Sequence, residues 1–197
     1  MNAIALTSDT YKKLILDING SVKRPFIIAI DGRCTSGKTT LASKLEKDLN
    51  ASILHMDDFF LRIEQRTKER YEEPGGNVDR ERVSDVIESY LKDKKIEYRP
   101  FSCKIWGLDN VKTIPYHDIL IVEGSYSMHP ELMKYYDYKI LMTIDSNKQL
   151  DRVLIRNGLQ KLEDFKTKWI PLEEKYFEKY DLEDKVDVVL DTTEGEL

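Results

Sequence analysis

Apolar residues along the chain fall into two alternating patterns. Short apolar runs occur at 26–30, 51–55, 119–122, 138–144 and 186–190, and such runs are typical of strands buried in a parallel sheet. Between them, apolar residues recur three and four positions apart, which predicts amphipathic helices. This alternation predicts an α/β fold, a three-layer α/β/α sandwich around a five-stranded parallel sheet.

The whole chain, 1–197, is expected to form a single domain. Residues 1–24 are predicted to contain an N-terminal helix that covers an edge of the sheet. Near the other end, Phe165, Trp169 and Tyr176 belong to a series of aromatic residues that we expect in the core rather than in a ligand site.

Residues 32–39 match the pattern G-x-x-x-x-G-K-[ST], and they lie between a predicted strand and a predicted helix. In such a phosphate loop, backbone N–H groups and the helix dipole converge on phosphate oxygens. Lys38 is expected to face solvent until it reaches the β- and γ-phosphates of a nucleotide, and the Thr39 hydroxyl is expected to ligate Mg²⁺. The predicted nucleotide-binding residues are Gly32, Thr35, Ser36, Gly37, Lys38, Thr39 and Thr40.

Acidic residues follow two of the predicted strands, at the end where parallel sheets bind ligands. Asp57 and Asp58 come just after the 51–55 run. Adjacent side chains of a strand point to opposite sides, so only one of them needs to face the nucleotide. Glu123 ends another run, and an acid there orients Mg²⁺ beside the loop threonine in proteins with this motif. A helix cap, a strand-end cap or a solvated loop acid is the alternative.

Basic residues form a stripe on the helix predicted after residue 144. Lys148, Arg152 and Arg156 are spaced four apart and therefore share one face. A fixed row of arginines suits bidentate contact with polyphosphate, although a solvated helix face has the same spacing. The highly charged segment 62–73 is more typical of a solvated surface.

Composition narrows the class of partner. The net charge of −5 and the pI of about 5.4 argue against a nucleic acid or an anionic membrane surface. No apolar run reaches membrane-spanning length, residues 1–10 lack a signal-peptide pattern, and two cysteines do not make a disulfide framework. We therefore expect a cytoplasmic protein with a small-molecule partner, and a homo-oligomer stays open.

Over most of its length after residue 25, the chain resembles the uridine kinase and phosphoribulokinase-like family of P-loop kinases. The resemblance rests on the phosphate loop and on four further segments, Met-Asp-Asp-Phe-Phe at 56–60, Gly-Asn-Val-Asp at 76–79, Ile-Val-Glu-Gly at 121–124 and Arg152-x-x-x-Arg156. The loop is shared by many ATPases, whereas an Asp followed by two aromatic residues at this distance from it is more specific.

The resemblance implies a strand order of 2-3-1-4-5, ATP as donor, Mg²⁺, and a small helical lid at about 148–168. The roles it assigns are Asp57 as catalytic base, Lys38, Arg152 and Arg156 as phosphate-contacting catalytic residues, Asn77, Asp79 and Tyr98 as acceptor-binding residues, and Thr39 and Glu123 as metal ligands.

The expected function is an ATP-dependent phosphotransferase that transfers the γ-phosphoryl group to a hydroxyl of a nucleoside or similar metabolite. Uridine kinases follow the mid-chain Tyr with Asp-Phe and a nearby His. Here Arg99-Pro100-Phe101 follow Tyr98 and no His lies between His55 and His117, so selectivity for uridine is not expected.

Two alternatives stay open. A nucleotide kinase would hold a phosphorylated acceptor, for which Arg62, Arg66 and Arg70 are available. A non-kinase nucleotide-binding switch of the GTPase type would need a guanine-reading Asn-Lys-x-Asp, and the segment 147–150 lacks its Asp.

Overall fold

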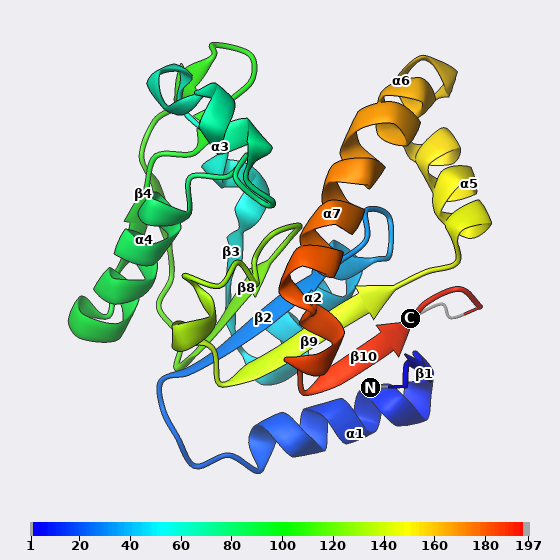
Figure 1. Cartoon of the computed structure of the whole chain (residues 1–197). Helices are drawn as coiled ribbons and strands as arrows, with labels where there is room; N and C mark the ends of the chain where they lie inside the picture. Colours follow the sequence, from blue (N-terminus) through cyan, green and yellow to red (C-terminus); the bar gives the residue numbers. More distant parts are fainter. Residues whose placement is uncertain (1, 195–197) are drawn as a thin grey trace.

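A six-stranded sheet forms the centre of the computed structural model, which describes residues 2–194 (Figure 1). Every neighbouring pair of strands is parallel, in the order β1-β10-β9-β2-β8-β3. The strands are β1 (Ile4–Ala5), β2 (Phe26–Gly32), β3 (Ser52–His55), β8 (Ile119–Glu123), β9 (Tyr138–Thr143) and β10 (Val188–Asp191). Without β1, this is the predicted order 2-3-1-4-5, so that prediction is confirmed.

The predicted number of five strands was wrong by one. The additional strand, β1, contains only two residues and extends the sheet by pairing Ile4 with Leu190 of β10. Two residues are too few to show a hydrophobic period, so the sequence pattern gave no signal for this strand.

Helices and short elements complete the chain. The α-helices are α1 (Ser8–Asn19), α2 (Lys38–Leu49), α3 (Lys68–Glu72), α4 (Arg80–Asp93), α5 (Ser146–Asn157), α6 (Leu159–Asp164) and α7 (Ile170–Tyr180). A π-helical turn, Phe165–Trp169, joins α6 to α7, and 3₁₀ turns occur at Met56–Phe59, Ile63–Gln65, Met133–Tyr135 and Leu182–Asp184. Two small antiparallel pairs are formed by β4 (Ile96–Tyr98) with β7 (Lys112–Ile114) and by β5 (Phe101–Ser102) with β6 (Gly107–Leu108). None of the helices in residues 2–194 combines the length and apolar character needed to cross a bilayer.

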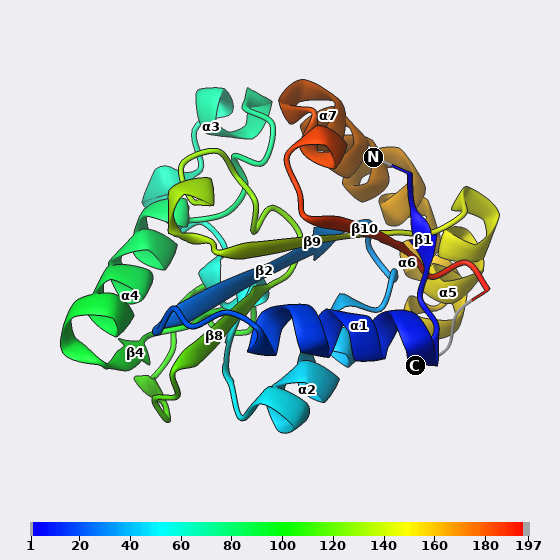
Figure 2. The same ribbon diagram turned by 90° about the horizontal axis from the view of Figure 1, so that it is seen from below.

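Alternate residues of β2 face two separate cores. Ile28 and Ile30 belong to the cluster that includes the apolar faces of α1 and α2, whereas Ile27 and Ala29 belong to the cluster that includes α4 and α7. Figure 2 shows α1 and α2 together beneath the sheet. The helix α1 therefore covers a face of the sheet with α2, and the expectation that it covers an edge was wrong.

The buried carboxylate of Asp31, near the end of β2, joins three segments. Its Oδ1 accepts hydrogen bonds from the N–H groups of Gly32 (2.7 Å) and Tyr126 (3.1 Å), and its Oδ2 accepts from the Met128 N–H (2.9 Å) and the Tyr176 hydroxyl (2.8 Å). Burial raises the pKa of Asp31 to about 6, although backbone donors and Lys38 oppose the rise. The phosphate loop, the loop after β8 and α7 thus meet at one side chain.

The first glycine of the phosphate loop leaves no room for a side chain. Gly32 has φ +140°, and a Cβ there would lie 2.0 Å from the carbonyl oxygen of Met142 in β9. We expect Gly32→Ala to lower the free energy of unfolding by roughly 3 kcal/mol or more, because backbone must move to relieve the overlap. Gly158→Ala is the control: its φ is +78°, but nothing lies within 4 Å, so only local backbone strain is added. Urea unfolding of both variants measures the difference, and equal losses would contradict the prediction.

Candidate active site

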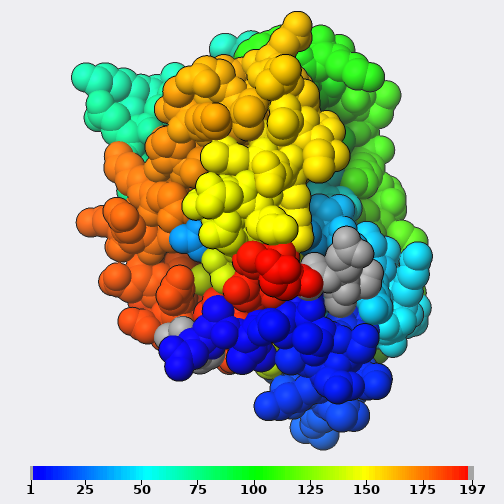
Figure 3. Space-filling model, turned by 90° about the vertical axis from the view of Figure 1, so that its right-hand side faces the viewer, coloured from blue at the N-terminus to red at the C-terminus, as the bar shows by residue number. Residues whose placement is uncertain are grey.

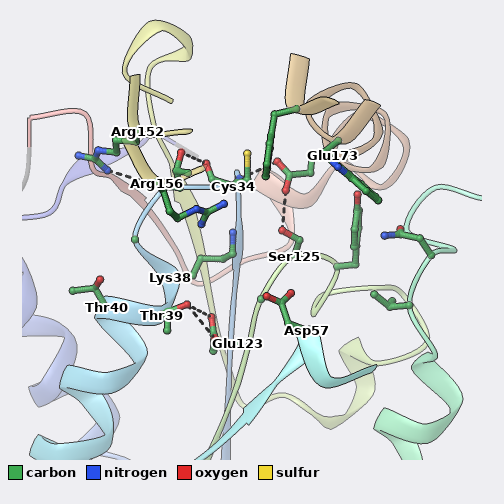
Figure 4. A pocket seen from close by; sticks show the side chains of 18 of the residues that line it. Cys34, Lys38, Thr39, Thr40, Asp57, Glu123, Ser125, Arg152, Arg156 and Glu173 are labelled. Carbon is green, nitrogen blue, oxygen red and sulfur yellow. Dashed lines mark hydrogen bonds between the residues drawn. The ribbon is translucent and has the colours of Figure 1, made fainter. Parts of the chain in front are cut away.

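The functional residues predicted from the sequence gather around one pocket of about 620 Å³ at the carboxyl ends of the central strands (Figure 4). The phosphate loop and α5 line one side, and the segments after β3 and β8 line the other, together with the π-helical turn and α7. Ten of the predicted residues line it: Thr35, Gly37, Lys38, Thr39, Thr40, Asp57, Asn77, Glu123, Arg152 and Arg156. The loop shape depends on left-handed backbone at Thr35 and Gly37.

The ammonium group of Lys38 is tied to the phosphate loop. Its Nζ donates to the carbonyl oxygens of Gly32 (2.7 Å) and Arg33 (3.0 Å), and the residue is only 9% exposed. The expectation that Lys38 faces solvent was therefore wrong, because an ammonium at the base of the loop finds carbonyl acceptors within it. Its charge is nevertheless part of the pocket lining, beside the amides of the loop.

Oxygen ligands suitable for Mg²⁺ meet at the start of α2. The Thr39 hydroxyl lies 3.3 and 3.4 Å from the two carboxylate oxygens of Glu123. His55 Nδ1 lies 2.6 Å from Glu123 Oε1, and this hydrogen bond raises the pKa of His55. Across residues 2–194, no three His, Cys, Asp or Glu side chains are grouped in a way that could hold a metal. A hydroxyl and one carboxylate fit Mg²⁺ that takes its remaining ligands from phosphates and water.

The two adjacent acids after β3 have different surroundings. Asp57 is exposed to the pocket. Partial loss of hydration raises its pKa, and the negative charge of Glu123 raises it further, whereas the positive charge of Lys38 opposes the rise. Asp58 accepts hydrogen bonds from the Tyr98 hydroxyl (2.6 Å) and Lys112 Nζ (2.8 Å), and it is absent from the pocket lining. Only one of the two acids faces the predicted nucleotide, although both lie on a 3₁₀ turn rather than on the strand itself.

Two predicted acceptor-binding residues lie outside the pocket lining. Asp79 is fully buried, caps α4 and pairs with Arg82 (2.8 Å) and Arg62 (3.4 Å), so its carboxylate has no free side for an acceptor. Tyr98 is buried against Phe59, with ring centroids 4.8 Å apart, and its hydroxyl is bonded to Asp58. The structure therefore gives both residues contacts that support the turn carrying Asp57.

Two predicted loop residues also lie behind the lining. The backbone of Gly32 packs against β9, and the Ser36 side chain is fully buried, with no hydrogen-bond partner for its Oγ among residues 2–194. These residues shape the loop from behind, while the neighbouring Thr35 and Gly37 line the pocket.

Several residues of the pocket were not predicted from the sequence. Phe60, Val78 and Tyr126 form apolar parts of its wall, and Ser125 and Tyr126 come two and three residues after Glu123, the last residue of β8. That position was a signal that could have identified them. Tyr126 also has φ +70°, an unusual backbone conformation for a bulky residue that is enriched at functional sites.

The aromatic series near the C-terminus divides between core and pocket. Tyr176 is fully buried, as expected, but Phe165 and Trp169 line the pocket, so their prediction as core residues was wrong. Both lie in the π-helical turn, which directly precedes α7. Helical spacing of apolar residues does not show whether that face of the helix packs against other side chains or lines a cavity.

Helix α7 contacts the phosphate loop through two consecutive glutamates. Glu173 is buried in the pocket wall, where its carboxylate accepts from the Cys34 N–H (2.9 Å) and the Ser125 hydroxyl (2.8 Å). Glu174 forms a bidentate ion pair with Arg33 at 2.7 and 2.9 Å. These contacts fix α7 relative to the loop and place the carboxyl group of Glu173 on the Asp57 side of the pocket.

No protein-family model matches the chain. Uridine-cytidine kinase A of Dictyostelium discoideum is 28% identical over 149 residues, which cover 72% of this chain but 30% of that protein. A uridine kinase of Clostridium perfringens is 25% identical over 146 residues, which cover 69% of this chain and 70% of that protein. A Bacillus stearothermophilus structure described as a "possible uridine kinase" superposes with a TM-score of 0.67, covering 93% of this chain and 98% of that one at 21% identity.

The superposition shows that this chain shares its overall fold with that structure. The chain is therefore similar in sequence to uridine kinases, and it has the phosphate loop and the fold of a kinase enzyme.

Proposed function

We propose that the protein transfers the γ-phosphoryl group of ATP to a hydroxyl of an uncharged, ring-bearing small molecule such as a nucleoside. The observation that carries this proposal is the arrangement of one pocket: phosphate-loop residues line one side and a solvent-accessible carboxylate, Asp57, lies among aromatic side chains on the other. A hydroxyl acceptor needs such a base within reach of the transferred group.

In the proposed reaction, the acceptor oxygen bonds to the γ-phosphorus, the bond from that phosphorus to the β–γ bridging oxygen breaks, and ADP leaves. The hydroxyl proton passes to Asp57. The loop amides and Lys38 orient the phosphates, and Arg156 adds positive charge on the same side of the pocket. Thr39 and Glu123 would hold Mg²⁺, which when bound neutralises phosphate charge.

An uncharged acceptor fits the Asp57 side of the pocket better than a phosphorylated one. That side carries two carboxylates, Asp57 and Glu173, whereas the lysine and arginines of the lining lie with the phosphate loop and α5 (Figure 4). A second phosphate group there would meet negative charge.

The three arginines available to a nucleotide kinase have other partners. Arg70 forms a bidentate pair with Glu81 (2.7 and 2.8 Å), and Arg62 lies 3.4 Å from a carboxylate oxygen of Asp79. Arg66 donates to the Leu61 carbonyl (3.0 Å), and its guanidinium carbon lies 5.1 and 4.9 Å from the ring centroids of Phe101 and Trp106. None of the three lines the pocket, so the nucleotide kinase alternative has less support than a nucleoside-type acceptor.

A panel of acceptors tests the proposal. Uridine, cytidine, adenosine and uridine monophosphate are supplied separately with MgATP, and ADP release gives kcat/KM for each. Aromatic walls discriminate weakly, so we expect the nucleosides to differ by less than about 100-fold and uridine monophosphate to react at least roughly 10-fold more slowly than uridine. Faster reaction of the monophosphate would favour a nucleotide kinase. Turnover confined to uridine and cytidine would contradict the weak discrimination between nucleosides. No ADP release with any acceptor would contradict the proposed phosphotransferase function.

A matched pair of tryptophan variants tests whether the aromatic lining of the pocket binds the acceptor. This lining, the acceptor wall, consists of Phe60, Tyr126, Phe165 and Trp169. Trp169→Ala removes a pocket aromatic and is expected to raise the acceptor KM by about 10-fold, since ring contacts supply much of the apolar binding energy. Trp106→Ala removes an exposed tryptophan outside this pocket and should leave the acceptor KM unchanged. Equal effects would contradict the placement of the acceptor.

A further inference from the structure

A pair of polar side chains interrupts the acceptor wall. Ser125 and Glu173 both line the pocket, and a hydrogen bond of 2.8 Å from the Ser125 hydroxyl to Glu173 Oε1 joins them. Aromatic residues of the wall flank the pair in the sequence, with Tyr126 next to Ser125 and Trp169 four residues before Glu173. A ring that packs against these aromatic side chains would therefore bring its edge to the pair.

Glu173 is reached from the pocket rather than from the outer surface of the molecule. The residue is only 4% exposed. Figure 3 shows the atoms of α5, in yellow, beside those of the segment that contains α6 and α7, in orange, on the outer face. In Figure 4, the carboxyl group of Glu173 points toward Ser125, and Asp57 lies beyond Ser125. A ligand group that contacts the pair thus occupies the same cavity as an acceptor hydroxyl beside Asp57.

The hydrogen bonds of the pair leave it without a donor for a ligand. The Ser125 hydroxyl has a single proton, which it donates to Glu173. The other carboxyl oxygen of Glu173, Oε2, accepts a hydrogen bond of 2.9 Å from the Cys34 N–H in the phosphate loop. Lone pairs remain on the serine oxygen and on both carboxyl oxygens, because each of these atoms can accept more than one hydrogen bond. Toward a ligand, the pair therefore acts as an acceptor of hydrogen bonds.

A wall that offers only hydrogen-bond acceptors at one place discriminates between ligand groups. When a ring covers the pair, water is displaced, and an oxygen that loses a hydrogen bond without replacement raises the free energy of the complex. An amino group on the ring replaces the lost hydrogen bond. A C–H group leaves the oxygen unpaired, and a carbonyl oxygen adds repulsion between lone pairs.

We infer that Ser125 and Glu173 are specificity-determining residues that accept hydrogen bonds from an amino group on the ring of the acceptor. This inference rests on the proposed phosphotransferase function, and it narrows the substrate class to hydroxyl acceptors with an amino-substituted ring. The ring is a better source of the donor than a sugar hydroxyl, because the pair is flanked by the aromatic residues Tyr126 and Trp169.

Analogues that lack one amino group test the inference on the unaltered protein. Whichever of cytidine and adenosine has the higher kcat/KM is compared with its analogue without the amino group, which is the riboside of pyrimidin-2-one or of purine. ADP release with MgATP gives kcat/KM for each acceptor. We expect loss of the amino group to lower kcat/KM by about 10-fold, mainly through KM. The 2′-deoxy analogue, which lacks a sugar hydroxyl instead, should react nearly as fast as the parent nucleoside.

The variant Glu173→Gln should reverse the hydrogen-bonding character of the pair. If the glutamine oxygen accepts from the Cys34 N–H, its amide nitrogen donates to Ser125, whose own proton is then free to point into the pocket. We expect the preference for the amino acceptor over its analogue to fall by about 5-fold or more, and the ratio of kcat/KM for uridine to that for cytidine to rise. The matched control is Glu174→Gln, since Glu174 pairs with Arg33 and is absent from the pocket lining; this variant should keep the wild-type ratios.

Equal kcat/KM for the amino acceptor and its analogue in the wild type would overturn the inference, and so would unchanged ratios in Glu173→Gln. A loss on removal of the sugar hydroxyl, with none on removal of the amino group, would assign the pair to the sugar and also overturn it. If no acceptor causes ADP release, the proposed function itself fails, which is distinguishable because that result extends to every acceptor. The comparison of analogues uses only the wild type, so it does not depend on how the variants fold.

Discussion

Replacing Lys38 by alanine is expected to lower phosphotransfer by roughly 10³-fold or more. Lys38 is the positive charge at the base of the phosphate loop, where the proposed reaction develops negative charge on the β–γ bridging oxygen. The substitution also removes the two hydrogen bonds from Nζ to the carbonyl oxygens of Gly32 and Arg33. ADP release under saturating MgATP and acceptor measures the loss.

The control for this prediction is Lys47→Ala, which removes an exposed lysine from the same helix. We expect that variant to keep full activity. Because Lys38→Ala loses two contacts within the loop, its thermal unfolding must be compared with that of the wild type, and a decrease of a few degrees is expected. Near wild-type phosphotransfer by Lys38→Ala would be incompatible with the proposed active site.

Replacing Asp57 by asparagine is expected to lower kcat by about 10²–10⁴-fold, the usual scale for loss of a general base. The amide keeps the shape of the carboxylate but cannot accept the hydroxyl proton, so MgATP affinity should change little. The pKa of Asp57 is raised above its ordinary value by loss of hydration and by Glu123. The acid limb of the wild-type kcat/KM profile should therefore lie at a higher pH than an ordinary aspartate would give, and this limb should disappear in Asp57→Asn.

The neighbouring acid supplies the control. Asp58→Asn weakens the hydrogen bonds from Tyr98 and Lys112 but leaves Asp57 in place, so its effect on kcat should be smaller. The pH profile of this variant should keep its acid limb. If Asp58→Asn is the more damaging change, or if it removes the limb while Asp57→Asn does not, the assignment of the base is wrong.

The order of the central strands and the position of the phosphate loop could be predicted because both depend on local signals. The β-branched run of β2 and the glycine pattern after it occupy consecutive residues, and the alternation of strands and helices limits the topology. The contacts of Lys38 could not be predicted from these local signals. A motif gives the identity of the side chain, but its contacts with the carbonyl oxygens of Gly32 and Arg33 depend on the three-dimensional path of the loop.

The acceptor wall could not be predicted because it combines residues from distant parts of the chain. Phe60, Tyr126 and Trp169 follow three different elements, and no spacing in the sequence relates them. Asp79 and Tyr98 lie close to these segments, but each is bonded to a partly buried side chain in place of a ligand: Asp79 to Arg82, and Tyr98 to Asp58. Identifying which of several nearby polar residues faces a cavity requires the packing of the whole domain.

The hydrogen bonds at Asp31 restrict how the substrate range of this enzyme can be re-engineered. A designer who replaces α7 or the loop after β8 with the equivalent segment of another kinase must also supply the Tyr176 hydroxyl and the backbone donors of Tyr126 and Met128, since all of them converge on one buried carboxylate. A transplanted segment without these donors would leave charge unpaired next to the phosphate loop. Substitutions confined to side chains that only line the wall, such as Trp169, avoid that penalty and are the safer starting point for changing the acceptor.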